Sequence, residues 1–550
     1  MMLTFFIRRD KYFDMDEWIE HRLIKSKSLE KREYQVNIAS VALKKNTLVV
    51  LPTGLGKTAV ALLIVADMLE NGKRCIVFAP TRVLVNQHYY FFKEHLNIDG
   101  VEAVTGSMSI MERMDVWSNA RVVCSTPQIA LNDIDRGILA IDDFGLLVFD
   151  EAHRAVGGYA YTKIATLSNA RIVGFTATLP DDKDRVMSIV DALKIERVEA
   201  RSEESLDVRA YVKDTKVEFV EVELNELLKG IRSRVLDALN SRLGSLRAYG
   251  IIDSTKVGVV DLIRIRDEVQ KGYGMGMGMG KGSGNTSNKD ITKMLYSAIR
   301  LSHALRVLDT QGLVTFTRFY QRLIEKRGIG MKELIRDLKE AYEMARGAAI
   351  SGIEHPKIDK LVEILRPFMN GSGRVIVFSS YRDSVETIHE RLRSEGFSAG
   401  YLIGKSVDSI GRGLRQDEQI DALERFKSGE YNILVATNVG EEGLDVAECN
   451  LVIFYDNVPS AIRFIQRKGR TGRRMSGRVI VLVTKDTIDE AYYWISKRKV
   501  KRVARVAEMI NGILAKKGFG LGSVSGNNKD KYKGNLNDIT HRLDNFILKD

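Results

Sequence analysis

A glycine-containing loop of eight residues, set between an apolar run and a helical run, restricts the possible folds of this chain more than any other stretch. Residues 51–58 read LPTGLGKT, follow the apolar residues 47–50, and precede good helix formers from Ala59 to Ala66. Strand, glycine loop and helix in this order form a phosphate cradle, because glycines let backbone N–H groups approach the phosphates and the helix N-terminus adds partial positive charge. The stretch therefore predicts a nucleotide-binding α/β domain.

Five residues of this loop are candidate ligands of a nucleoside triphosphate and Mg²⁺. In the usual pattern the lysine reaches the β and γ phosphate oxygens and the next hydroxyl binds the metal, which gives these roles to Lys57 and Thr58. Leu51 replaces the first glycine of that pattern, the one visible departure from it. The predicted ligands are Thr53, Gly54, Gly56, Lys57 and Thr58.

The pattern around the loop predicts two parallel sheets. From residue 47 to 200, short β-branched runs alternate with helical patterns, and a second such series begins near residue 374 without a phosphate loop of its own. Near-continuous apolar strands separated by helices are typical of parallel sheets covered on both faces. Between the two series, apolar residues recur every three or four positions, which predicts an inserted helical bundle.

We therefore expect an α/β chain in four parts. Residues 1–210 form a nucleotide-binding sheet domain, 211–350 a helical insert, 351–495 a second sheet domain, and 496–550 a basic C-terminal tail. The helices of the insert carry enough basic charge for several phosphate contacts, and ordinary solvated faces are the alternative. The ten basic residues are Arg232, Arg234, Arg242, Lys293, Arg300, Arg306, Arg318, Arg322, Lys326 and Arg327.

Residues directly after the predicted strands are the candidate site, because ligands bind at the carboxyl ends of parallel strands. Asp150 and Glu151 follow one apolar run, where one acid can hold Mg²⁺ through water and the other can orient an attacking water; helix capping is the alternative. Thr81, Arg82 and Thr126 follow two other runs and could hold a nucleic-acid backbone, although each alone could be an ordinary turn or cap.

In the second series, the stretch 466–473 (QRKGRTGR) carries arginines at a glycine-broken helix end. Arginines in this setting suit insertion into the γ-phosphate site of a neighbouring domain, where they stabilise transition-state charge. Upstream of the phosphate loop, the Gln35 amide could read an adenine edge with its donor and acceptor together.

Seven short motifs occur in order across the two sheets: LPTGLGKT, APTR, STPQ, DEAH, TAT, ATNVGEEGLD and QRKGRTGR. This set resembles the superfamily 2 helicases. Longer strings at 150–161 and 458–474 resemble the archaeal Hef helicase and the Fanconi-anaemia M branch-point translocases. The resemblance implies two RecA-like domains with a helical domain inserted between them, and ATP with Mg²⁺ as cofactors.

The resemblance also implies roles for single residues. Gln35 would contact adenine, Asp150 would position the metal, and Glu151 would be the general base. Arg470 and Arg473 would act as arginine fingers, His153 and Gln466 would couple nucleotide state to the interface, and Asp445 would be a further nucleotide contact. Arg82, Thr126, Ser379 and Thr437 match positions that grip the strand backbone.

The expected function is that of an ATP-dependent helicase or translocase on forked or branched DNA, in repair or replication-fork processing. One alternative is an RNA helicase, because the same motifs serve both polymers. A second alternative is a clamp that binds structured nucleic acid without hydrolysis, against which the intact Lys57, Glu151, Arg470 and Arg473 argue.

Composition bounds the partners. A net charge of +12 indicates a polyanion partner. The three cysteines, Cys75, Cys124 and Cys449, each lie in or beside apolar runs, which predicts buried thiols rather than disulfides or zinc ligands. We expect a cytoplasmic protein without membrane spans. Residues 540–547 have two hydrophobic anchors suited to a sliding clamp, and a separate nuclease is a further expected partner, since the last stretch lacks an acidic metal cluster.

Overall fold

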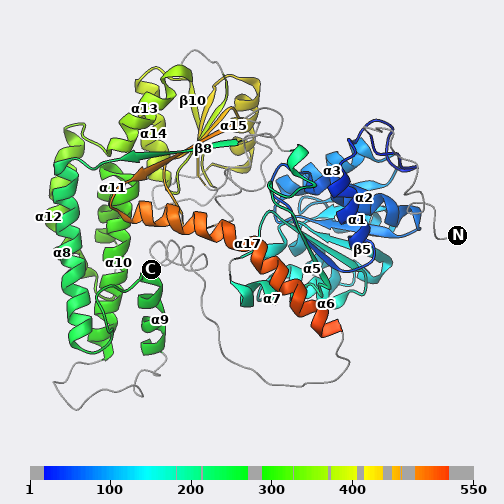
Figure 1. Cartoon of the computed structure of the whole chain (residues 1–550), viewed down its shortest axis with the longest axis horizontal. Coiled ribbons are helices and arrows are strands. Elements are labelled where there is room, and N and C mark those ends of the chain that lie inside the picture. The colour runs from blue at the N-terminus through cyan, green and yellow to red at the C-terminus, as the bar shows by residue number, and fades with distance from the viewer. Residues whose placement is uncertain are drawn as a thin grey trace. The chain divides into compact units, whose positions relative to one another are not determined.

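The computed structural model describes residues 18–180, 182–211, 215–270, 288–325, 328–368, 373–404, 414–437, 449–458, 460 and 477–518. The chain divides into two compact units (Figure 1). Unit 1 comprises most of the first 213 residues together with the chain from Lys499 to the end of the C-terminal helix, and unit 2 holds most of residues 214–498.

Unit 1 is built on a parallel seven-stranded sheet of order β3-β4-β2-β5-β6-β1-β7. Its strands are β1 (Thr47–Val50), β2 (Arg74–Phe78), β3 (Val101–Val104), β4 (Val122–Ser125), β5 (Phe144–Phe149), β6 (Arg171–Thr176) and β7 (Arg197–Ala200). Its helices are α1 (Glu33–Ala42), α2 (Lys57–Glu70), α3 (Arg82–His95), α4 (Ile110–Asn119), α5 (Pro127–Asp135), α6 (Ala160–Leu167) and α7 (Lys183–Ala192). Separate apolar clusters cover the two faces, which confirms the predicted doubly covered sheet.

The last part of the C-terminal helix α17 (Ile488–Gly518) belongs to the core of unit 1. Val506, Ala507 and Ile510 pack in the same apolar cluster as sheet residues such as Ile76. The Asn511 side chain donates to the Val198 carbonyl at 2.8 Å and accepts from the Val198 N–H at 2.9 Å, so it covers part of the free edge of β7. The sequence predicts only a basic tail here, because lysines and arginines outnumber the apolar residues that form the buried stripe.

Unit 2 contains a parallel six-stranded sheet of order β10-β11-β9-β12-β13-β8. Its strands are β8 (Thr215–Val222), β9 (Val375–Phe378), β10 (Ala399–Leu402), β11 (Ile433–Ala436), β12 (Leu451–Phe454) and β13 (Gly477–Thr484). Helices α13 (Pro356–Leu365), α14 (Arg382–Ser394) and α15 (Gln416–Ser428) accompany the sheet. The segment predicted to be helical from residue 211 thus begins with a strand, which pairs with β13 over eight residues. As an edge strand with charged positions such as Glu218, β8 has no continuous apolar run to reveal it.

The helical insert of unit 2 consists of α8 (Glu226–Ala248), α9 (Val259–Gln270), α10 (Asn288–Gln311), α11 (Leu313–Glu325) and α12 (Met331–Ile350). The residues predicted to form apolar stripes, such as Leu228, Ile231 and Val235 on α8 and Leu295 and Ile299 on α10, are buried in one cluster. None of the helices in the described part of the chain is long and apolar enough to cross a membrane.

Candidate nucleotide site and nucleic-acid contacts

The phosphate loop lies between β1 and α2, as its flanking residues predict. Gly54 and Gly56 have φ angles of 93° and 79°, a left-handed conformation that glycine adopts without strain, and α2 begins at Lys57. Leu51 is fully buried in the core cluster and has no positive φ, so the absent first glycine is not needed for this backbone. The free N–H groups at the start of α2 therefore face the loop, which suits an anionic ligand.

Two side chains of α1 hold the loop in place. The Tyr34 hydroxyl donates to the Leu55 carbonyl at 2.7 Å, and the Gln35 amide donates to the same oxygen at 3.1 Å. A Cβ atom at Gly56 would lie 2.4 Å from the Gln35 amide nitrogen, so only glycine fits there. Gln35 therefore supports the phosphate loop, and its contact with adenine stays a prediction.

The acids after β5 lie beside the loop lysine. Lys57 Nζ is 3.8 Å from Glu151 Oε1, and both side chains are largely buried. Glu151 has a φ of 49°, a strained conformation for a residue with a side chain and one that is common at functional sites. His153 Nδ1 lies 3.3 Å from Glu151 Oε2 and 3.1 Å from the Thr176 hydroxyl, which connects the DEAH and TAT motifs.

His88, which the sequence analysis missed, orients Asp150. Its Nε2 lies 3.0 Å from Asp150 Oδ2, and the Tyr161 hydroxyl donates to the Asp150 carbonyl oxygen at 2.8 Å. Burial alone would raise the pKa of Asp150, but the hydrogen bond with His88 and the charge of Lys57 outweigh it and hold the pKa below its usual value. His88 lies on the buried face of α3, and a single histidine on a helix gives no sequence signal for this role.

The residues present fit a nucleotide with Mg²⁺. Glu151 Oε2 is buried, and its 3.3 Å contact with His153 Nδ1 is the ion pair described above rather than a well-formed hydrogen bond, so this oxygen can still accept one from a water. Asp150 and Thr58 offer oxygen atoms, which Mg²⁺ prefers, and this ion usually keeps several waters and takes phosphate oxygens as further ligands. Within the residues that the structure describes, no group of three or more His, Cys, Asp or Glu surrounds one point.

The predicted nucleic-acid contacts of unit 1 follow β2 and β4. Thr81 caps α3 by accepting from the Leu84 N–H at 3.3 Å, and both Thr81 and Arg82 are exposed. A Cβ atom at Gly106 would lie 2.7 Å from Arg82 Nη2, so the turn after β3 approaches this guanidinium closely. Thr126 precedes α5 and makes no capping bond, although it is nearly buried.

Two further predicted contacts lie in unit 2. Thr437 follows β11 and is 7% exposed. Ser379 follows β9, but it is fully buried and its hydroxyl donates to Gln311 at 3.0 Å. A contact between Ser379 and a nucleic-acid strand stays a prediction. In this structure the Ser379 hydroxyl stabilises the turn after β9. Gln466, Arg470, Arg473 and Asp445 lie outside the described residues, as does the segment 540–547.

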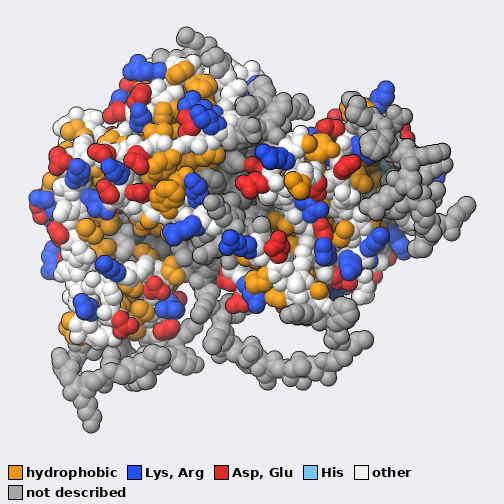
Figure 2. All heavy atoms as spheres, viewed as in Figure 1, with side chains coloured by type: hydrophobic (Ala, Val, Ile, Leu, Met, Phe, Trp, Pro, Cys, Tyr) orange, Lys and Arg blue, Asp and Glu red, His pale blue; other side chains and the backbone are white. Residues whose placement is uncertain are grey.

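The basic residues of the helical insert require a correction. Arg232, Arg242, Arg318 and Arg322 are paired with Asp309, Asp337, Asp383 or Glu386, and Arg300 and Arg306 are buried. The expected phosphate contact is wrong for Arg300 and Arg306, which are buried. The other four use their charges in ion pairs, and their contact with phosphates stays a prediction. Arg234 and Lys293 form exposed pairs, and Lys326 and Arg327 lie outside the described residues. On the face shown in Figure 2, basic and acidic side chains of the insert are interspersed.

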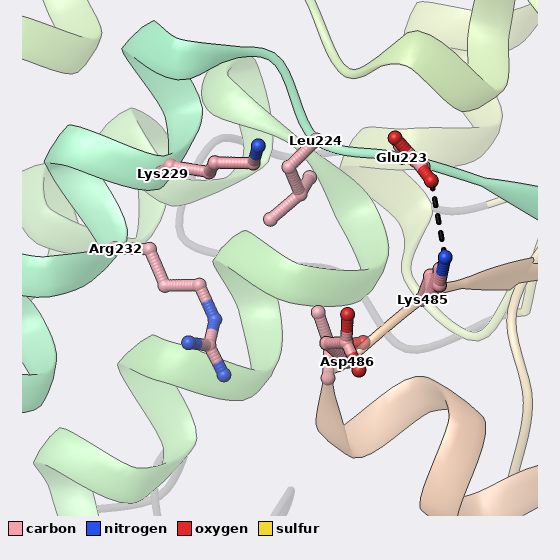
Figure 3. Close-up of a pocket in the computed structure, with 7 residues that line it drawn as sticks. Glu223, Leu224, Lys229, Arg232, Lys485 and Asp486 are labelled. Carbon is pink, nitrogen blue, oxygen red and sulfur yellow. Dashed lines mark hydrogen bonds and ion pairs between the residues drawn. The ribbon is translucent and has the colours of Figure 1, made fainter.

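A pocket lies where the insert joins the second sheet, and Arg232 is the one residue of its lining that the sequence analysis names (Figure 3). It is lined by Glu223 and Leu224 after β8, Lys229 and Arg232 of α8, and the turn after β13. Its three cations are paired: Lys485 with Glu223 at 3.2 Å, Lys229 with Glu226 at 2.8 Å, and Arg232 with Asp309 at 2.8 Å. These pairs neutralise the pocket, which therefore offers no excess charge for an anion.

Comparisons with known proteins agree with this geometry. Residues 32–186 match the DEAD/DEAH box helicase family, and residues 356–475 match the helicase conserved C-terminal domain. A protein of Methanocaldococcus jannaschii named as an ATP-dependent RNA helicase is 38% identical over 509 residues, which cover 91% of this chain and 64% of that protein. The ATP-dependent DNA helicase mph1 of Neurospora crassa is 33% identical over 491 residues, which cover 84% and 41%.

The chain thus spans less than two thirds of the length of these curated relatives. Among solved structures, the crystal structure of the Pyrococcus furiosus Hef helicase domain is 37% identical, with a TM-score of 0.62. The match covers 86% of this chain and the whole of that domain. The predicted resemblance to Hef is therefore confirmed, and the chain belongs to the Hef-like branch of the superfamily 2 helicases.

Proposed function

We propose that this chain is an ATP-dependent helicase or translocase that acts on forked or branched DNA during repair or replication-fork processing. The observation that carries the enzymatic part is the position of Glu151, buried at the end of β5 with Oε1 3.8 Å from Lys57 Nζ. A carboxylate beside the lysine of a phosphate loop is placed to act on water that attacks a bound γ-phosphate.

Each residue of the site has a defined task in this proposal. Burial alone would raise the pKa of Glu151, but Lys57 and His153 outweigh it and hold the pKa below its usual value, so the side chain is a carboxylate at neutral pH and can orient the attacking water. Lys57 and the N–H groups at the start of α2 hold the phosphates. Asp150 would hold the metal through water, and Mg²⁺, when bound, neutralises phosphate charge.

Residues outside the described part of the chain complete the proposal. Arg470 and Arg473 would stabilise transition-state charge, Gln466 would couple the nucleotide to the domain interface, and Asp445 would contact the nucleotide. The motif matches in residues 356–475 support these assignments. A sliding clamp, bound through residues 540–547, and a separate nuclease remain the proposed protein partners.

The first experiment determines whether the chain acts on DNA or on RNA, because the Neurospora relative is named a DNA helicase and the Methanocaldococcus relative an RNA helicase. We expect ATP turnover to be stimulated most by forked or four-way DNA, less by single-stranded and linear duplex DNA, and least by an RNA fork of matched sequence. Stronger stimulation by the RNA fork would favour the RNA helicase instead.

The same assay distinguishes a non-hydrolysing clamp. Such a protein would bind forked DNA in a mobility-shift titration but would show no turnover with any polymer. Turnover that is stimulated by nucleic acid and lost in Glu151→Gln would exclude this alternative.

A further inference from the structure

The turn that joins β9 to α14 is held from one side by the helical insert. We use the name β9–α14 turn for residues 379–384, which comprise the loop after β9 and the first residues of α14. This segment contains Ser379, which by motif position is a candidate contact of a nucleic-acid strand. Ser379, Ser380, Tyr381, Asp383 and Ser384 all interact with side chains of α10 or α11, or with a residue that those helices hold. Figure 1 shows α11 running beside α14, and the two helices are in contact.

Gln311, the last residue of α10, lies at the centre of these interactions. Its amide oxygen accepts from the Ser379 hydroxyl at 3.0 Å and from the Ser384 hydroxyl at 2.7 Å. The Gln311 amide nitrogen donates to Asp456 Oδ2 at 2.6 Å, and this carboxylate oxygen of Asp456 also accepts from the Ser380 N–H at 2.8 Å. Gln311 is only 4% exposed, so one amide group satisfies several buried polar atoms that water does not reach.

Two further groups of side chains hold the remainder of the turn. The Tyr381 hydroxyl lies 2.9 Å from His303 Nε2, and its ring packs against the apolar cluster of the insert. Asp383 is paired with Arg322 at 2.7 Å and with Arg318 at 3.3 Å, and the Asp383 side chain is 7% exposed. Every one of these partners lies on α10 or α11.

The arrangement has an energetic consequence. A buried polar group that loses its partner costs about 1–3 kcal/mol, so the turn cannot leave this conformation without breaking several such contacts together. Because the partners lie on the insert, a movement of α10 relative to the sheet would change the conformation of the turn.

We propose that Gln311 is a positioning residue that sets the conformation of residues 379–384 for binding a nucleic-acid strand. The inference rests on the proposed function, and it makes the helical insert a determinant of strand affinity through the turn rather than through phosphate contacts of its own. Arg318 and Arg322 of the insert also position the turn, because their charges hold Asp383.

The test compares Gln311→Met with the wild-type chain in ATPase assays titrated with a single-stranded DNA. Methionine keeps the volume of the side chain but removes the amide group. We expect the half-saturating DNA concentration to rise roughly tenfold, equivalent to one or two net hydrogen bonds. Turnover at saturating DNA and the unstimulated rate should remain within about twofold, because neither measures strand affinity.

A second variant of the turn and a control variant elsewhere in the insert accompany Gln311→Met. Ser384→Ala removes one contact with Gln311 and should show a smaller effect in the same direction, which also covers the case in which Gln311→Met does not fold. Lys339→Met breaks an exposed ion pair with Glu343 on α12 and should leave the half-saturating concentration unchanged.

The outcomes separate the two proposals. Folded Gln311→Met with an unchanged half-saturating concentration, or a loss of turnover at unchanged DNA affinity, would overturn the role of Gln311 and leave the helicase assignment intact. A wild-type chain that no nucleic acid stimulates would contradict the proposed function, and the inference would fall with it.

Discussion

Glu151 is the residue whose replacement tests the chemistry most directly. We expect Glu151→Gln to reduce turnover by at least about 10²-fold, because a single positioned group is worth orders of magnitude in phosphoryl transfer, while ATP binding stays within several-fold of normal. Steady-state ATPase assays and a titration with a fluorescent nucleotide measure the two quantities. Glu94→Gln, on the exposed surface of α3, is the matched control and should keep full turnover.

Asp309 should make the stability of unit 2 depend on pH. Burial raises its pKa from 3.8 to about 6, in spite of its ion pair with Arg232. The folded protein therefore binds this proton more tightly than the unfolded chain, and the free energy of unfolding falls as the pH rises from about 4 to about 6. Asp309→Asn removes this dependence.

The expected shift is about 3 kcal/mol in favour of the Asp309→Asn variant, relative to wild type, between pH 4 and pH 7. Urea unfolding followed by circular dichroism at several pH values measures it. Asp253→Asn, at an exposed position outside the helices, should follow the wild type at every pH. A constant difference between Asp309→Asn and wild type would contradict the assigned direction.

The site residues at the ends of strands could be predicted from the sequence, but the residues that position them through hydrogen bonds could not. Asp150 and Glu151 follow a conspicuous apolar run, and parallel strands bring their carboxyl ends together. His88 and Gln311 lie inside helices, and their partners are 62 and 145 residues away in the sequence. Such contacts depend on how the helices pack on the sheet, which no local pattern encodes.

At the scale of elements, the C-terminal part of α17 contributes to the stability of unit 1. Asn511→Leu should lower the free energy of unfolding of unit 1 by about 1–3 kcal/mol, because it leaves the N–H and C=O groups of Val198 on the edge of β7 without their partner. Hydrogen exchange of the Val198 amide, compared with that of a central strand, measures the local effect. Protection equal to wild type would show that the edge does not need this side chain.

A buried ion pair connects three elements of unit 2. Lys357 of α13 donates to the carboxylate of Asp489 at 2.5 Å and to the Tyr455 carbonyl at 2.8 Å, and both charged side chains are fully buried. Lys357→Met should cost about 3–5 kcal/mol, since it leaves the carboxylate buried without its counter-charge. Lys360→Met, one turn along α13 in an exposed pair with Glu363, should cost less than about 1 kcal/mol in the same urea titrations.

Helices and strands with a regular apolar period could be predicted from the sequence, but elements in which charged residues interrupt the apolar pattern could not. The apolar stripes of α8 and α10 and the β-branched strands of both sheets stand out because each is buried on a regular period. The charged face of β8 obscured an edge strand of the second sheet, and the lysine-rich sequence of α17 obscured a helix that contributes to the core of unit 1. In both, few apolar residues suffice because only one face is covered.

At the scale of the whole molecule, separate cores predict separate unfolding. The apolar clusters of unit 1 and unit 2 contain different residues, so scanning calorimetry should resolve two transitions rather than one. Asn511→Leu should lower the temperature of one transition and Lys357→Met that of the other. The double variant should show both shifts unchanged, because distant sites add. A single transition lowered equally by either variant would show that the units unfold together.

The contribution of α17 to unit 1 also affects the order of events during synthesis. The seven strands of that unit have all left the ribosome about 300 residues before Val506, Ala507 and Ile510 are made. At about 5–20 residues per second, the nascent sheet waits on the order of 15–60 s with part of one apolar face and one strand edge uncovered. During that interval the second unit is being completed. The N-terminal sheet of this helicase is therefore fully covered only after α17 has been made, and until then its exposed face is a place for chaperones to bind.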